Sequence, residues 1–208
     1  MQSAELKEMV VAELGGALAT LGFERRTGLG FTVAVGRGVV GRIALTQSYV
    51  KSERAFWVLP MAGVRYEAAA KIVDEVLGYK SGLASPTIQT ALVHLVAGRD
   101  PADAFWVFGE DADARAAALA DLMRCVDEAA LPYMRSLATA DAILEALRER
   151  DDAESRFQEA VLLWATGARD DGVAGLRALA EAGESAEAAS TEEFYAEAAA
   201  EALEVLGG

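Results

Sequence analysis

Residues 23–63 hold four segments with strand-like patterns, and the connections between them have the length of hairpin turns. The segments are Phe23–Arg26, Phe31–Val35, Val39–Gln47 and Phe56–Met61. Glycine, serine and charged residues fill the connections, which is typical of β-turns. Parallel strands need a long crossover connection, so the sequence predicts an antiparallel β-meander. Because proline has no N–H to donate, Pro60 predicts that the fourth strand lies at a sheet edge or ends there.

Helical patterns lie on both sides of this meander. Residues 3–21 and 64–78 carry apolar residues at helical spacing, and a glycine ends each pattern. The pair Gly15–Gly16 predicts a close packing contact in the first helix. Residues 87–97 fit either a helix that begins at Ser85–Pro86 or a strand, and Phe105–Phe108 fits a strand or a buried turn.

The chain after Gly109 has the pattern of consecutive helices, and the 44 alanines of the sequence favour helix. The expected helices cover residues 111–130, 139–148, 152–166, 170–182 and 191–206, with a break or kink at Leu131–Pro132 and a flexible loop at Gly183–Ser190. The predicted fold class is α+β, with an N-terminal helix, a small antiparallel meander and a largely helical C-terminal half. We expect an α+β domain over residues 1–148 and an acidic helical extension over residues 149–208.

Charge is distributed unevenly along the chain. The 33 acidic and 19 basic residues give a net charge of −14. Residues 101–208 carry 8 basic and 24 acidic residues, and residues 22–65 carry seven basic and two acidic ones. An acidic chain does not favour nucleic-acid binding, which usually needs a basic surface. No apolar run has the length of a membrane span, and residues 1–20 lack the pattern of a signal peptide, so we expect a cytoplasmic protein.

The acidic second half suggests an interaction protein without enzymatic activity that binds a basic protein partner through its helices. An antidote to a cationic toxin, which is an immunity-type role, or an accessory subunit of a bacterial system would fit. The candidate partner-binding residues are Asp151, Asp152, Glu154, Asp170 and Asp171. The same asymmetry also fits acidic helices that are solvated or that face the basic segment within one fold. Self-association through apolar helices is compatible with each hypothesis.

Basic and aromatic residues of the meander support an alternative function, a module that binds a small anionic ligand or a nucleotide. The candidate ligand-binding residues are Arg25, Arg37, Arg42, Arg54 and Trp57. They would act together only if several share one sheet face, and a register shift of one residue would separate Arg42 from Trp57. A solvated sheet face explains the same residues without a ligand.

No pattern predicts catalytic residues, a metal site or a cofactor. The chain has one cysteine and one histidine, which excludes a Cys-rich zinc site and any motif with two histidines. We expect Cys125 in a helix core and His94 buried or half-buried. An enzyme built on this pair as nucleophile and base is a third hypothesis, and no flanking signature supports it. Acidic residues such as Asp111 and Asp152 stand where helices begin, where they cap free N–H groups.

Three short segments form a pattern: Leu21-Gly22-Phe23-Glu24-Arg25-Arg26 after the first helix, Phe105-Trp106, and the step Leu131-Pro132 that is followed by Leu137. Together they resemble the domain-of-unknown-function family 4304. The resemblance covers about residues 4–147 and departs from the family pattern around Ser81–Val96. It implies an α+β fold with an opening helix and a β-meander, and it brings no catalytic residues with it.

Overall fold

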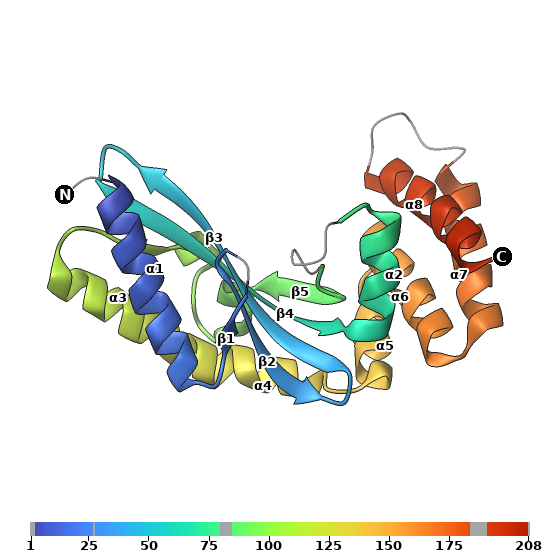
Figure 1. The fold of residues 1–208 in the computed structure, drawn as a ribbon, viewed down its shortest axis with the longest axis horizontal. Helices are drawn as coiled ribbons and strands as arrows, with labels where there is room; N and C mark the ends of the chain where they lie inside the picture. Colours follow the sequence, from blue (N-terminus) through green and yellow to red (C-terminus); the bar gives the residue numbers. More distant parts are fainter. Residues whose placement is uncertain (1–2, 27, 80–84, 184–190, 208) are drawn as a thin grey trace. The chain divides into compact units, whose positions relative to one another are not determined.

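A computed structural model describes residues 3–26, 28–79, 85–183 and 191–207 of the chain, and Figure 1 shows its elements in chain order. The first half contains all six strands of the described residues. Its elements are α1 (Ser3–Thr20), β1 (Glu24–Arg25), β2 (Gly30–Gly36), β3 (Val39–Val50), β4 (Ala55–Tyr66), α2 (Glu67–Val76), β5 (Ile88–Ala91), the 3₁₀ turns η1 (Leu92–Leu95) and η2 (Pro101–Asp103), and β6 (Trp106–Phe108).

The second half consists of helices and short connections in its described residues. Its elements are α3 (Ala112–Cys125), the π-helical turn η3 (Val126–Ala130), α4 (Leu131–Ser136), α5 (Ala140–Arg148), α6 (Ala153–Thr166), α7 (Arg169–Gly183) and α8 (Thr191–Leu206). Local signals set several of these boundaries. The side chains of Thr139 and Asp152 accept hydrogen bonds from Ala142 N and Ser155 N, which caps α5 and α6. Gly167 ends α6 at φ +104°, a backbone conformation that glycine adopts without strain.

The strands form one sheet in the order β1-β2-β3-β4-β5, and β6 pairs antiparallel with β4. β1 pairs antiparallel with β2, so that Arg25 lies opposite Phe31. Consecutive strands are therefore neighbours in the sheet, as a meander requires. The predicted α+β fold class, with its N-terminal helix, antiparallel sheet and helical C-terminal half, is confirmed.

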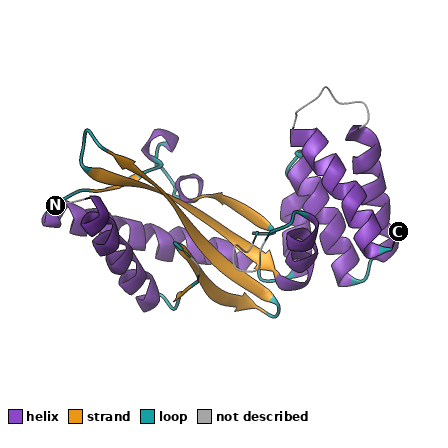
Figure 2. Ribbon diagram, turned by 45° about the horizontal axis from the view of Figure 1, so that its top comes forward, coloured by secondary structure: helices purple, strands orange, loops and turns teal. Residues whose placement is uncertain are grey.

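One face of the sheet is covered by helices α1, α3 and α4 (Figure 2). Burial alternates along the first part of β3, where Val39, Gly41, Ile43 and Leu45 are buried and the residues between them are half-buried. A side chain at Gly41 would place its Cβ 2.7 Å from Met134 Sδ of α4, so this row faces the helices. α1 adds Leu6, Val10, Leu14 and Leu18 to the same core.

The fourth strand is longer and more central than the sequence predicts. β4 continues through Pro60 to Tyr66 and has paired strands on both sides, so the expected edge position or strand end at Pro60 is wrong. β6 pairs with residues Phe56–Val58, before Pro60, and Thr87 N donates to Val64 O beyond it. Pro60, which has no N–H to donate, therefore lies between the part of β4 that pairs with β6 and the part that bonds to Thr87.

Of the two alternatives for residues 87–97, the strand is confirmed over Ile88–Ala91, and no helix begins at Ser85–Pro86. β5 covers only four residues, and η1 follows it directly. Helix α2 begins at Glu67 rather than at residue 64, because β4 takes the first residues of that pattern. For Phe105–Phe108, where a strand or a buried turn was expected, the strand is confirmed over Trp106–Phe108 as β6.

Pro132 lies inside a continuous helical path instead of breaking it. A proline ring clashes with the carbonyl four residues earlier, here that of Glu128. The chain widens at this point into the π-helical turn η3, in which Leu131 N donates to Val126 O five residues before it. α4 then continues to Ser136, so the wider turn accommodates the proline.

The expected close contact at Gly15–Gly16 is wrong. A Cβ at Gly16 would meet nothing within 4 Å, and one at Gly15 would meet only Phe31 Cε1 at 3.9 Å, an ordinary van der Waals distance. A loop was expected at Gly183–Ser190. Gly183 is the last residue of α7, and residues 184–190 lie outside the described residues.

The chain divides into two compact units. Unit 1 comprises the described parts of 1–35, 41–63 and 89–136, and unit 2 those of 36–40, 64–88 and 137–208. Unit 1 contains α1, α3 and β6, and unit 2 is dominated by α2 and α5–α8, among which α6 packs against each of the other four. The expected division into an α+β domain at 1–148 and an acidic helical extension at 149–208 stays a prediction.

Candidate functional site

The structure separates the five meander residues that the sequence groups as a ligand site. Arg25 lies opposite the buried Phe31, on the sheet face that α1 covers. Arg42 alternates with the buried residues of β3, and Trp57 alternates with those of β4, so both lie on less buried positions. Arg25 therefore belongs to a different surface from Arg42 and Trp57.

Arg42 and Trp57 are also far apart along the hairpin. The ring of Tyr49 packs against that of Phe56 at 5.1 Å between centroids, so these residues pair near the closed end. Arg42 lies seven residues before Tyr49, which separates it from the Trp57 end by roughly 20 Å at about 3.3 Å per residue. Trp57 instead donates from Nε1 to Glu53 Oε2 at 2.9 Å and packs against Phe105.

The remaining two arginines lie in turns. Arg37 is exposed in the turn between β2 and β3. Arg54 lies in the turn before β4 with φ +51° and forms an ion pair with Glu110 at 2.8 Å. The five residues thus form no common ligand site.

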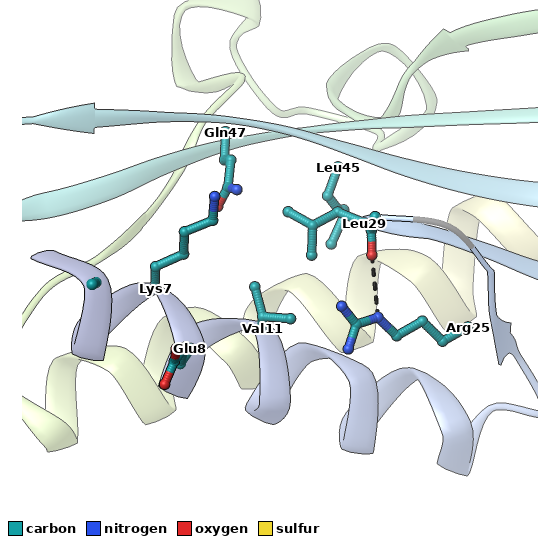
Figure 3. A pocket seen from close by; sticks show the side chains of 9 residues that line it. Lys7, Glu8, Val11, Arg25, Leu29, Leu45 and Gln47 are labelled. Atoms are coloured by element: carbon teal, nitrogen blue, oxygen red, sulfur yellow. Dashed lines mark hydrogen bonds between the residues drawn. The ribbon is translucent and has the colours of Figure 1, made fainter. Parts of the chain in front are cut away.

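An open groove lies between α1 and the sheet, and Arg25 is the predicted residue that lines it (Figure 3). We call it the α1 groove and define it by Lys7, Val11, Arg25, Leu29, Leu45 and Gln47. Its volume is about 570 Å³. Lys7 extends toward Gln47 at one end and the Arg25 guanidinium lies at the other, with Val11, Leu29 and Leu45 between them.

The five predicted partner-binding acids lie at the first turns of two helices. Asp151, Asp152 and Glu154 are at the start of α6, and Asp170 and Asp171 are in the first turn of α7, which follows the other end of α6. Fourteen helical residues span about 21 Å, so the two groups are widely separated. Asp152 caps α6, and acidic residues in a first turn stabilise the helix itself.

Glu154 interacts with α8 rather than pointing freely into solvent. Partial burial of its carboxyl group and the nearby Asp152 raise the pKa of Glu154, while a hydrogen bond with Tyr195 opposes that rise. Burial also raises the pKa of Tyr195, and the nearby Glu154 raises it further. The Tyr195 ring packs on Phe157 at 5.7 Å, so this group helps attach α8 to α6.

Acidic residues without such a structural task lie on the outer face of α8. Glu197, Glu201 and Glu204 are exposed and follow helical spacing, with the exposed side chains of Phe194 and Val205 at the ends of the row. We call these five residues the α8 acidic surface. Within the described part of the chain, no ion pair or hydrogen bond involves the side chains of its three glutamates.

The sequence contains the signal for this surface. Residues 178–208 hold eight glutamates and no lysine or arginine. Glutamates at positions i, i+4 and i+7 of one helix must lie on one face. The acidic residues that were predicted to bind a partner lie instead next to the starts of α6 and α7.

The lone histidine and cysteine do not form a site. His94 is exposed on η1, so the expected burial is wrong, whereas Cys125 is buried in α3 as expected. Burial raises the pKa of the Cys125 thiol, which disfavours the reactive thiolate. Among the residues that the structure describes, no three His, Cys, Asp or Glu side chains group as metal ligands would.

Asp121 beside Cys125 is the centre of a polar network. It accepts hydrogen bonds from Arg99 at 2.7 Å, Arg124 at 2.7 Å and Trp106 Nε1 at 2.9 Å. Burial alone would raise the pKa of Asp121, but these donors outweigh it and hold the pKa below its ordinary value. Arg99 also stacks over the Trp106 ring at 3.9 Å. The three groups that donate to the Asp121 carboxylate all belong to unit 1.

None of the described helices is both long and apolar enough to cross a membrane. No protein-family model, curated protein or solved structure matches the chain. The resemblance of residues 4–147 to the domain-of-unknown-function family 4304 therefore stays a prediction.

Proposed function

We propose that this protein is an interaction module, without enzymatic activity, that binds a basic protein partner through the α8 acidic surface. The observation that carries the proposal is the row Glu197, Glu201 and Glu204, which is exposed and has no cationic partner among the described residues.

The row does not stabilise α8. Like charges four residues apart on a helix destabilise it by about 0.2–0.5 kcal/mol per pair. Carboxylates near a helix C-terminus also face the negative end of the helix dipole. Glu192 and Glu193 in the first turn favour the helix, whereas Glu201 and Glu204 near its end do not. A cationic partner would remove both costs.

The apolar ends of the row provide anchors for such a partner. Phe194 is 49% exposed and Val205 is 42% exposed. A few side chains that become buried on association contribute most of the affinity of typical interfaces, and the surrounding charges set the association rate and the choice of partner. The α8 acidic surface combines both features on one helix face.

A basic partner fits an accessory or immunity-type role in the cytoplasm. The partner would be a cationic toxin that the chain neutralises, or a basic subunit of a bacterial assembly. Its surface would carry arginine or lysine at the spacing of the three glutamates, beside an apolar patch that receives Phe194.

Two variants with equal charge test the proposal. Glu197→Gln, Glu201→Gln and Glu204→Gln together remove three charges from the α8 acidic surface. Asp103→Asn, Asp113→Asn and Asp127→Asn together remove three exposed charges from unit 1. Each tagged protein is used for affinity capture from a lysate of its native host at low and at high salt, followed by mass spectrometry.

We expect one stoichiometric basic protein with the wild type and with the unit 1 variant, and its loss with the α8 variant or at high salt. Retention by the α8 variant, equal loss with both variants, or no captured protein at either salt concentration would contradict the proposal.

A further inference from the structure

We infer that the α1 groove binds a small organic anion, whose carboxylate or phosphate group is held by Arg25 and Lys7 and whose apolar body lies on Val11, Leu29 and Leu45. The site is independent of the proposed function, because no residue of the α8 acidic surface takes part in it.

Arg25 is held in a position that leaves its anion-binding atoms available. Its Nε donates to the carbonyl oxygen of Gly28 at 3.1 Å, which fixes the guanidinium plane. Within the described chain, neither Nη atom has a hydrogen-bond or ion-pair partner. A guanidinium fork of this kind matches two oxygens of a carboxylate or phosphate.

Lys7 supplies a second cation across the groove. Its side chain extends along the groove toward Gln47 (Figure 3), and no described carboxylate pairs with it. Glu8 also lines the groove, but its side chain points away from Gln47 and Leu45. The groove interior is therefore positively charged, in a chain whose net charge is −14.

The space between the cations is apolar and large enough for an organic molecule. Small-molecule sites usually have volumes of about 300–1,000 Å³ and combine apolar walls with a few placed polar groups. The α1 groove, at about 570 Å³, has this composition. Leu45 is 6% exposed, so a ligand there would lie against the core of unit 1.

Nuclear magnetic resonance titration of the full chain tests the inference with four probes: hexanoate, hexyl phosphate, inorganic phosphate and hexanol. We expect both hexyl anions to produce saturable shifts at the backbone amides of Val11, Leu29, Leu45 and Gln47. Inorganic phosphate and hexanol should each bind at least about tenfold more weakly, because one lacks the apolar body and the other the charge. The tighter of the two anions identifies the preferred head group.

Neighbouring arginines provide a matched control. Arg25→Gln should weaken binding of the tighter anion at least about tenfold. Arg26→Gln should leave it unchanged, because Arg26 does not line the groove and pairs with Glu24 at 3.2 Å. Equal weakening by both variants, equal affinity for hexanol, or no saturable shift with either hexyl anion would overturn the inference. A circular dichroism spectrum of each variant confirms that it is folded.

Discussion

Arg115 of α3 donates from Nε to Glu13 Oε2 of α1 at 2.9 Å, although 102 residues separate the two in sequence. Its Nη1 donates to the carbonyl oxygens of Gly109 and Glu110 at 3.1 and 3.3 Å. The Arg115 side chain is 8% exposed and that of Glu13 is 33% exposed, so a buried guanidinium pairs with a half-buried carboxylate. The pair joins the first helix to the helical second half within unit 1.

Arg115→Met should lower the free energy of unfolding by about 2–3 kcal/mol, because it leaves Glu13 and two carbonyl groups without their donor. Arg148→Met is the control. Arg148 pairs with Glu159 at 2.6 Å, but its side chain is 56% exposed, and such pairs contribute less than about 1 kcal/mol. Urea unfolding followed by circular dichroism measures both variants. Equal losses would show that the buried pair has no special role.

Gly172→Ala should destabilise the packing of α7 on α6. An added Cβ would lie 2.7 Å from Ala160 O and 2.8 Å from Trp164 N, and these backbone atoms cannot rotate away. We expect a loss of about 1–3 kcal/mol, although alanine favours helix over glycine by about 1 kcal/mol.

Gly16→Ala is the matched substitution, because its Cβ would meet nothing within 4 Å. It should raise the free energy of unfolding by up to about 1 kcal/mol. Thermal unfolding of the two variants should shift Tm in opposite directions, and a stabilising Gly172→Ala would contradict the close approach of α6 and α7.

Asp121 should contribute stability that depends on pH. Its pKa is lowered in the folded protein, so the folded state binds fewer protons than the unfolded state while the carboxyl titrates. The contribution is present above the unfolded pKa, which is near 3.9 for aspartate, and is lost as the pH falls through the folded pKa. The difference in Tm between the wild type and Asp121→Asn should therefore be larger at neutral pH than at acidic pH. A difference in Tm that stays constant or grows toward acidic pH would contradict a stabilising role of the ionised Asp121 carboxylate.

Local signals in the sequence were sufficient for most helices. Thr139 and Asp152 cap α5 and α6 through their own side chains, and Gly167 ends α6 through its own backbone. In each case the two interacting groups lie within a few residues of each other, so a short stretch of sequence contains both of them. The meander was predictable for the same reason, because hairpin-length connections force neighbouring strands to pair.

Features that depend on how neighbouring strands pair or how a helix is wound were not predictable in this way. Pro60 is tolerated because β6 and the residues around Thr87 pair with β4 on either side of it. Pro132 is tolerated because the preceding turn widens. The general preference of proline for strand edges and helix ends does not take these surroundings into account.

The candidate sites differ in the same respect. Whether Arg25 shares a surface with Arg42 depends on strand register, which a one-residue shift reverses. Lys7, Arg25 and Gln47 come together only because α1 crosses the sheet. The row of Glu197, Glu201 and Glu204, by contrast, lies on one helix, and its spacing alone places it on one face.

The proposed binding of a basic protein by the α8 acidic surface should depend on charge. The most direct test is the association rate of the captured protein with the wild type, measured by stopped flow at increasing salt, beside the α8 and unit 1 variants. We expect a one-to-one complex whose association slows as salt rises, and a slower, less salt-dependent association for the α8 variant alone. An association rate that is independent of salt, or that is the same for all three proteins, would contradict this proposal.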